Sequence, residues 1–237
     1  CNEVKDAVAK ADADPDVRVV VITGAGGKAF SAGYDLLDPD GAKYRDKGIE
    51  GWNWRMNHDL NYNSCVWRCS KPTIAMVQGY CFGGAFTQLS ACDFAVAADE
   101  AIFGLSEVNW GILPGGIMSW NLTDMLLPRH AMYYAVTGEP FNGKRAVEIG
   151  FVNKSVPKAK LKAEVAMTTR SAVGPSPPKC RAAIIAKMAE GIAACSRMTR
   201  FSSTEHGRNF ASTRNSTGTT PNRSTHAITI TRQPCSE

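Results

Sequence analysis

Short apolar runs recur along the chain at the spacing expected of strands that alternate with helices. These runs are rich in β-branched residues and alanine, which suits strands buried on both faces. We predict five strands from them, over 17–23, 73–77, 93–98, 101–104 and 151–156.

Segments with helical periodicity separate these runs, because their apolar residues lie three and four positions apart. They predict helices over 2–11, in the later part of 38–63, from 86, over 114–127, 129–136 and 144–149, from 157, and within 175–193. In the last of these helices the expected apolar face comprises Ile184, Ile185, Met188 and Ile192. The alternation of strands and helices predicts an α/β protein.

The segment after Phe201 differs in composition from the rest of the chain. It is rich in Ser, Thr, Asn and Arg and contains no lysine, so we expect it to be poorly ordered. The organisation we predict is a core over 1–170, a helical region over 171–200 and an atypical tail over 201–237. Because the chain begins with Cys1 rather than Met, we expect it to be a fragment.

Composition excludes several classes of function. Of the 237 residues 44% are apolar and the net charge is +5, a modest value that does not indicate a nucleic-acid partner. No apolar run is long enough to cross a membrane. The eight cysteines form no C-x-x-C pair, which disfavours a metal site or a redox motif. We therefore expect a protein of the reducing cytoplasm, without metal, with Cys81 and Cys92 as small core residues.

The stretch GYCFGGAF, residues 79–86, follows a predicted strand and precedes a predicted helix. A glycine pair at such a junction leaves backbone N–H groups free to stabilise a developing oxyanion. The alternative is a tight turn that needs glycine only for its conformation. The sequence of this stretch alone favours neither.

The stretch KAFSAGYDL, residues 28–36, offers a second backbone site. Its small residues would let a ligand approach the chain, and the N–H of Tyr34 could point into a site. An ordinary loop after a strand is the alternative. The preceding stretch GAGG, residues 24–27, lacks the G-K-[ST] that a phosphate-binding loop requires.

Three segments together, 28–36, 71–107 and 137–157, resemble the crotonase family, also called the enoyl-CoA hydratase/isomerase superfamily. The resemblance implies a spiral of ββα turns followed by a helical C-terminal region. It implies assembly as homotrimers or hexamers and an acyl-CoA thioester substrate whose enolate is stabilised. No separate cofactor is implied, since coenzyme A is part of the substrate. The family's usual N-terminal strands are missing here.

The run GLSEVNWGILPGG, together with CFGGAF, is most similar to the hydroxycinnamoyl-CoA hydratase-lyases of this family. These enzymes hydrate feruloyl-, caffeoyl- or coumaroyl-CoA and cleave the product to acetyl-CoA and a vanillin-type aldehyde. Carried over, the resemblance makes Glu107 the acid/base and the N–H groups of Tyr34 and Gly84 the oxyanion hole. Thr87 stands where simple hydratases have a first glutamate and is a further candidate catalytic residue, whose hydroxyl either orients water or only packs. The substrate-binding residues implied are Ala32, Gly33, Asp35, Leu36, Gly83, Ser106 and Trp110.

Other interpretations stay open at this point. The tyrosine that holds the phenol in the lyases has no clear counterpart, since Pro39 lies near its position and Tyr44 further on. A plain enoyl-CoA hydratase or isomerase is the first alternative. A second is a non-catalytic relative that binds RNA, although no lysine cluster or stacking motif supports it. A third is an inactive or assembly-dependent subunit.

Overall fold

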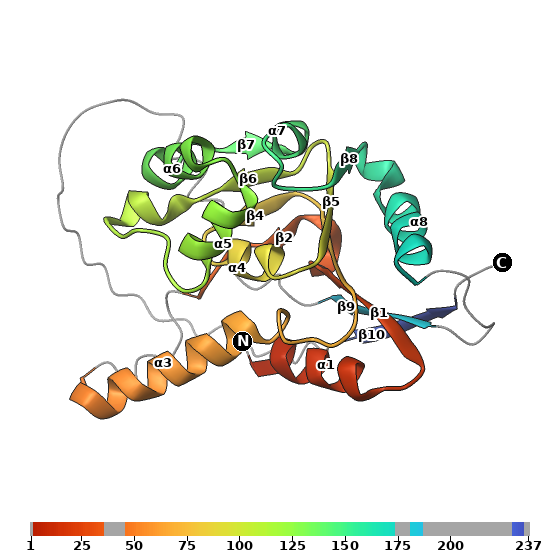
Figure 1. Cartoon of the computed structure of the whole chain (residues 1–237), viewed down its shortest axis with the longest axis horizontal. Coiled ribbons are helices and arrows are strands. Elements are labelled where there is room, and N and C mark those ends of the chain that lie inside the picture. The colour runs from red at the N-terminus through yellow and green to blue at the C-terminus, as the bar shows by residue number, and fades with distance from the viewer. Residues whose placement is uncertain (1, 36–45, 174–180, 187–228, 235–237) are drawn as a thin grey trace, which may run out of the picture.

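The computed structural model describes residues 2–35, 46–173, 181–186 and 229–234 (Figure 1). Two sheets form its framework, a larger one of six strands and a smaller one of four. Most strands of both sheets run parallel, so successive strands are joined by crossovers rather than by hairpins.

The larger sheet has the strand order β10-β9-β1-β3-β5-β8. Its strands are β1 (Val17–Thr23), β3 (Thr73–Val77), β5 (Phe94–Ala98), β8 (Lys154–Val156), β9 (Arg181–Ala186) and β10 (Thr229–Pro234). In β1 and β3 nearly every side chain is buried, as expected for strands covered on both faces. Figure 1 shows α1 and α8 on either side of β1, which both helices contact.

The smaller sheet has the order β2-β4-β6-β7. Its strands are β2 (Ala29–Ser31), β4 (Tyr80–Phe82), β6 (Ile102–Gly104) and β7 (Phe141–Asn142). The first three are parallel, and β7 is antiparallel to β6. The three parallel strands therefore place their carboxyl ends at one edge of the sheet.

The chain repeats one turn three times. In each turn a strand of the larger sheet is followed after a few residues by a strand of the smaller sheet: β1 by β2, β3 by β4, and β5 by β6. Equivalent strands of successive turns pair with each other. This is the predicted α/β spiral, and the fold class is confirmed.

Helices connect the turns and cover the sheets. The α-helices are α1 (Asn2–Ala13), α3 (Gly48–Ser64), α4 (Ala85–Ser90), α5 (Met118–Met125), α6 (Pro128–Thr137), α7 (Gly143–Glu148) and α8 (Leu161–Val173). Three short 3₁₀ segments accompany them: η1 (Ala25–Gly27), η2 (Ser106–Trp110) and η3 (Lys158–Lys160). All six residues of α4 are buried, so this helix is held firmly inside the molecule.

Four phenylalanines pack around α4. Phe86 of α4 stacks on Phe151 with ring centroids 5.0 Å apart, and Phe103 of β6 stacks on Phe141 of β7 at 5.3 Å. The two pairs meet edge to face, with the Phe86 and Phe103 centroids 6.3 Å apart. Burial of each ring contributes about 2–3 kcal/mol, and the cluster fixes α4 against the strands on which the candidate site is built.

The cysteines behave largely as the sequence predicted. Cys81 and Cys92 are buried free thiols, and burial raises the pKa of both. In the part of the chain that the structure describes, no group of three or more His, Cys, Asp and Glu side chains could hold a metal ion. None of the described helices has the length and apolarity needed to cross a bilayer.

The predicted helix within 175–193 is wrong for Arg181–Ala186, which form strand β9. These residues pair in parallel with β1, from Val17↔Arg181 to Thr23↔Ala186. The reason is that β1 would otherwise present a row of unpaired backbone groups, and the pairing outweighs helical periodicity in a short apolar run.

Poor order is likewise a wrong prediction for Thr229–Pro234 in the tail. These residues form β10, which pairs antiparallel with β9. The remainder of the tail lies outside the described residues, as do 174–180. The proposed boundaries at 170 and 200 stay a prediction.

Candidate active site

The candidate site lies at the carboxyl ends of three neighbouring parallel strands. Tyr80 of β4 is in register with Ala29 of β2 and with Ile102 of β6. The residues that follow these strands therefore meet at one edge of the smaller sheet, a usual position for ligand sites in parallel sheets. The following segments are 32–35 after β2, 83–84 after β4 and 105–107 after β6.

Gly33 and Gly84 bring two of these segments into contact. Gly33 has φ +92°, and a Cβ built on it would lie 2.9 Å from the Phe82 carbonyl oxygen and 3.1 Å from the Gly84 nitrogen. Only glycine has room here and readily adopts this conformation. The close approach places the peptide of Tyr34, the next residue, beside the peptide of Gly84.

The backbone N–H groups of Tyr34 and Gly84 have no hydrogen-bond acceptor among the described residues. Gly84 directly precedes α4, whose first turn is closed by bonds from Phe86 N to Gly83 O and from Thr87 N to Gly84 O, at 3.0 and 3.2 Å. Two neighbouring donors without a partner can bind one oxygen atom that carries negative charge.

Glu107 lies against the same glycine turn. A Cβ built on Gly83 would be 3.5 Å from Glu107 Oε1 and 3.4 Å from Ser106 Oγ. The other carboxylate oxygen, Oε2, is buried and receives no hydrogen bond from any described residue. Burial raises the pKa of Glu107, and a bond from its own backbone N–H only partly opposes that shift. The carboxylate is therefore a stronger base than an exposed one, as proton transfer requires.

Thr87 lies in α4, one turn below Gly84, with 2% of its surface exposed. It stands at the position where a first glutamate was expected in simple hydratases, and it adds a hydroxyl rather than a carboxylate. Glu107 therefore has no acidic counterpart at position 87.

The Tyr34 side chain lies over Gly84. A Cβ on Gly84 would be 2.3 Å from Cδ2 of the Tyr34 ring. The Tyr34 hydroxyl donates a hydrogen bond of 2.6 Å to Asn63 Oδ1 at the end of α3. Burial, with the nearby charge of Asp59, raises the pKa of Tyr34, so the hydroxyl stays protonated and remains a donor.

The sequence motifs do not predict a role for Asn63, because they involve only the backbone of Tyr34. No motif surrounds Asn63, and the contact joins residues 29 positions apart. It depends on how α3 is rotated against the sheet, which the periodicity of that helix does not determine.

The other predicted site residues differ in how deeply they are buried. Gly83 and Ser106 are buried beside Glu107, Ala32 is half-buried, and Asp35 is exposed. Trp110 ends η2 with 57% of its surface exposed. Leu36, and with it Pro39 and Tyr44, lies outside the described residues.

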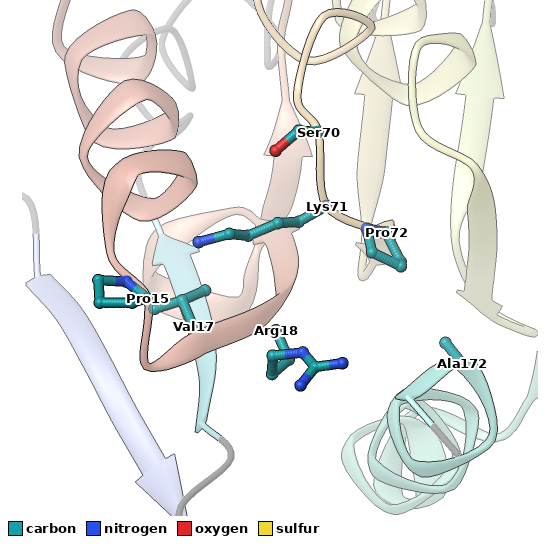
Figure 2. A pocket seen from close by; sticks show the side chains of 7 residues that line it. All are labelled: Pro15, Val17, Arg18, Ser70, Lys71, Pro72 and Ala172. Carbon is teal, nitrogen blue, oxygen red and sulfur yellow. The ribbon is translucent and has the colours of Figure 1, made fainter. Parts of the chain in front are cut away.

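A separate hollow of about 440 Å³ lies at the amino ends of β1 and β3 (Figure 2). It is lined by Pro15, Val17, Arg18, Ser70, Lys71, Pro72 and Ala172. Lys71 Nζ donates to the carbonyl oxygens of Ala11 and Asp14, at 2.7 and 2.5 Å. Ser70 Oγ donates to Asp12 Oδ1 at 2.7 Å. These two side chains already have protein partners.

Comparison with known proteins agrees with the fold. The enoyl-CoA hydratase/isomerase family model matches residues 1–219. A hydroxycinnamoyl-CoA hydratase-lyase of Pseudomonas fluorescens is 40% identical over 192 residues, which cover 77% of this chain and 66% of that protein. A carnitinyl-CoA dehydratase of Escherichia coli K12 is 39% identical over 156 residues, covering 62% and 54%.

Solved structures show the same relation. An enoyl-CoA hydratase of Bacillus anthracis has a TM-score of 0.63 at 28% identity, covering 72% of this chain and 64% of its own. An enoyl-CoA hydratase subunit of Geobacillus kaustophilus HTA426 has a TM-score of 0.64 at 32% identity, covering 75% and 65%. The chain thus spans between 54% and 66% of the length of these four relatives.

Proposed function

Because the chain belongs to the enoyl-CoA hydratase/isomerase family, we propose that it binds an acyl-CoA thioester and stabilises its enolate. The observation that carries this proposal is the close approach of Gly33 to the Gly84 nitrogen, next to which the N–H groups of Tyr34 and Gly84 have no acceptor among the described residues. The thioester oxygen accepts both bonds. Negative charge grows on this oxygen as the enolate forms, so the two donors stabilise the transition state more than the bound substrate.

Glu107 moves the protons in this scheme. It takes a proton from water as the water oxygen bonds to the β-carbon, and the double-bond electrons pass to the thioester as an enolate. The enolate α-carbon then takes that proton, which completes hydration. The raised pKa of Glu107 suits a group that must both accept and return a proton near neutral pH.

The finer proposal is that the substrate is a 4-hydroxycinnamoyl-CoA and that cleavage follows hydration. Glu107 takes the proton of the new β-hydroxyl, the bond between the α- and β-carbons breaks, and a hydroxybenzaldehyde leaves. The remaining acetyl-CoA enolate is protonated to acetyl-CoA. Support comes from the similarity to the hydroxycinnamoyl-CoA hydratase-lyase and from the hydroxyl residue at Thr87.

A single carboxylate is enough for such a substrate. Its para-hydroxyl pushes electrons through the ring and stabilises positive charge at the β-carbon. A second glutamate is then unnecessary, so Thr87 is tolerated. The second candidate is plain hydration or dehydration of an aliphatic acyl-CoA, which the similarity to carnitinyl-CoA dehydratase favours.

The test is to incubate the protein separately with feruloyl-CoA, cinnamoyl-CoA and crotonyl-CoA. We expect release of aldehyde and acetyl-CoA from feruloyl-CoA only, with kcat/KM at least about 10²-fold above that for hydration of the other two, given the missing second carboxylate. Equal values, or turnover of crotonyl-CoA alone, would remove the lyase proposal and leave a simple hydratase. Absence of both turnover and thioester binding would contradict an acyl-CoA site altogether.

We also propose assembly as a trimer or hexamer. Trp67 and Trp120 form an edge-to-face pair with centroids 5.9 Å apart, although 53% and 60% of their surfaces are exposed. Large apolar side chains that pair on a surface are typical of contacts between subunits. Light scattering coupled to size-exclusion chromatography measures the oligomer directly, and a monomeric mass would contradict assembly.

A further inference from the structure

We propose that Asn63 is a positioning residue of the candidate oxyanion hole, holding the Tyr34 peptide beside Gly84 through the Tyr34 hydroxyl. The proposal rests on the proposed function, since it concerns the same pair of N–H donors. Asn63 itself does not contact the thioester in this scheme. It acts through the side chain of Tyr34.

The hydrogen bond is well suited to this task. Asn63 is 3% exposed, and its Oδ1 accepts the Tyr34 hydroxyl at 2.6 Å, near the short end of the range for such bonds. The bond is part-buried, because Tyr34 is 40% exposed, but breaking it leaves the amide oxygen of the buried Asn63 without this donor.

The Tyr34 peptide needs such a restraint. It follows Gly33, which has φ +92° and no side chain to limit its rotation. The side chain of Tyr34, held at its ring by Gly84 and at its hydroxyl by Asn63, is therefore what fixes the direction of its N–H.

Helix α3 is in turn fixed to α4, which begins directly after Gly84. Gln88 of α4 is completely buried, and its Nε2 donates a 3.0 Å hydrogen bond to the carbonyl oxygen of Tyr62. Tyr62 precedes Asn63, and its ring packs edge to face on Tyr34 with centroids 5.8 Å apart. The contacts thus form a closed path from Gly84 to Tyr34, from Tyr34 to Asn63, and from Tyr62, the neighbour of Asn63 in the chain, through Gln88 back to α4.

Asn63 has little freedom to leave this position. A Cβ built on Gly116, in the loop before α5, would lie 2.7 Å from Asn63 Nδ2. The Asn63 amide is therefore enclosed between the Tyr34 segment and the loop before α5. A displacement of α3 would move the Tyr34 hydroxyl with it and so alter the distance between the two N–H donors.

The test uses Tyr34→Phe, Asn63→Leu and the double variant in the full chain. Tyr34→Phe removes only the hydroxyl and keeps the backbone N–H. The probe is acetoacetyl-CoA, whose bound enolate absorbs in the ultraviolet and reports oxyanion stabilisation without any assumption about the natural acyl group. The dissociation constant of free coenzyme A, measured separately by calorimetry, reports binding that does not depend on the oxyanion hole.

We expect each single variant to lower the bound enolate-to-keto ratio about tenfold, the effect of one hydrogen bond, with the dissociation constant of free coenzyme A unchanged. The double variant should lose no more than either single one, because both remove the same bond. Asn63→Asp keeps an acceptor oxygen and should restore most of the ratio to that of the native chain. The matched control is Asn61→Leu, an exposed residue of the same helix, which should change nothing.

An unchanged ratio in Tyr34→Phe would overturn the proposal, even if Asn63→Leu fails to fold. So would a double variant about 100-fold impaired, which would show independent effects. Failure of the native chain to enolise bound acetoacetyl-CoA would overturn the proposed oxyanion hole and this proposal with it. If the native chain enolises the probe and the variants show the same enolate-to-keto ratio, only the role of Asn63 would be overturned.

Discussion

The candidate site lies at the carboxyl ends of strands, whereas the hollow of Figure 2 lies at the amino ends of strands. The two regions differ in whether the polar groups named below have hydrogen-bond partners. At the carboxyl ends of β2, β4 and β6, two N–H groups and Glu107 Oε2 have no partner among the described residues. At the amino ends of β1 and β3, Lys71 and Ser70 are bonded to neighbouring segments. Ser70 and Lys71 of the hollow are thus engaged in holding the fold together, whereas the two N–H groups and Glu107 Oε2 remain available to a ligand.

The carboxylates of Asp12 and Glu107 illustrate this contrast. Asp12, beside the hollow, accepts bonds from the Ser70 hydroxyl and backbone N–H at 2.7 and 3.0 Å, and chiefly the hydroxyl bond lowers its pKa. Glu107 receives no such bond at Oε2, and burial raises its pKa. A carboxylate whose charged form accepts hydrogen bonds, as Asp12 does at Oδ1, stabilises the fold. One that is buried and underbonded destabilises it but is available to take a proton.

The largest effect is expected from Glu107→Gln. The substitution keeps size and removes the proton-transfer group, so kcat should fall by about 10²–10⁴-fold while binding of the acyl-CoA is retained. Steady-state kinetics together with calorimetric binding of the thioester measure both quantities. Wild-type kcat in the variant would exclude Glu107 as the acid/base.

The matched variant at the hollow is Ser70→Ala. It removes a hydroxyl that bonds only to Asp12 among the described residues, so turnover should be unchanged. A comparable loss of kcat there would mean that the hollow, and not the edge of the smaller sheet, belongs to the site.

A smaller loss, about 10²-fold in kcat, is expected from Gly84→Pro, because proline lacks the N–H donor. The backbone of Gly84, with φ −54° and ψ −11°, is itself compatible with proline. Gly84→Ala is the comparison, since it keeps the N–H but places a Cβ 2.3 Å from the Tyr34 ring. If Gly84→Pro folds and stays fully active, the Gly84 N–H is not part of an oxyanion hole.

Much of the framework was predictable from local sequence. The runs that became β1 and β3 are so rich in β-branched and apolar residues that no other element suits them. The glycine turn at 83–84 was visible because glycine is needed where two backbones approach. The pairing of Arg181–Ala186 with β1 was not predictable, because it depends on an open strand edge far away in the chain.

Only the part of the site that depends on local sequence motifs was predictable. Gly33, Gly84 and Glu107 come together because each follows a strand of the same sheet. The contact of Tyr34 with Asn63 joins a loop to a helix 29 residues later. It requires the packing of α3, which many rotations would satisfy equally on periodicity alone. Side-chain contacts between turns of the spiral therefore could not be predicted from the sequence.

The smallest effect expected is on stability, and it has opposite signs in the two regions. The pKa of Asp12 is lowered from its ordinary value of 3.8, so its ionisation stabilises the fold. That contribution is present above 3.8 and is lost as pH falls through the lowered value. The pKa of Glu107 is raised from 4.5, so its contribution is present below 4.5 and is lost as pH rises through the raised value.

At neutral pH, Asp12→Asn should therefore lower the free energy of unfolding, by about 1 kcal/mol or less for an exposed carboxylate, and Glu107→Gln should raise it. Both differences from the native chain should shrink towards acid pH, where the two carboxylates are protonated. Urea unfolding from acid to neutral pH measures them, with Asn61→Leu as the control. The ionised Asp12 carboxylate is expected to stabilise the fold and the ionised Glu107 carboxylate to destabilise it. A change of the same sign in the free energy of unfolding of both variants at neutral pH would therefore contradict the contrast between the two regions.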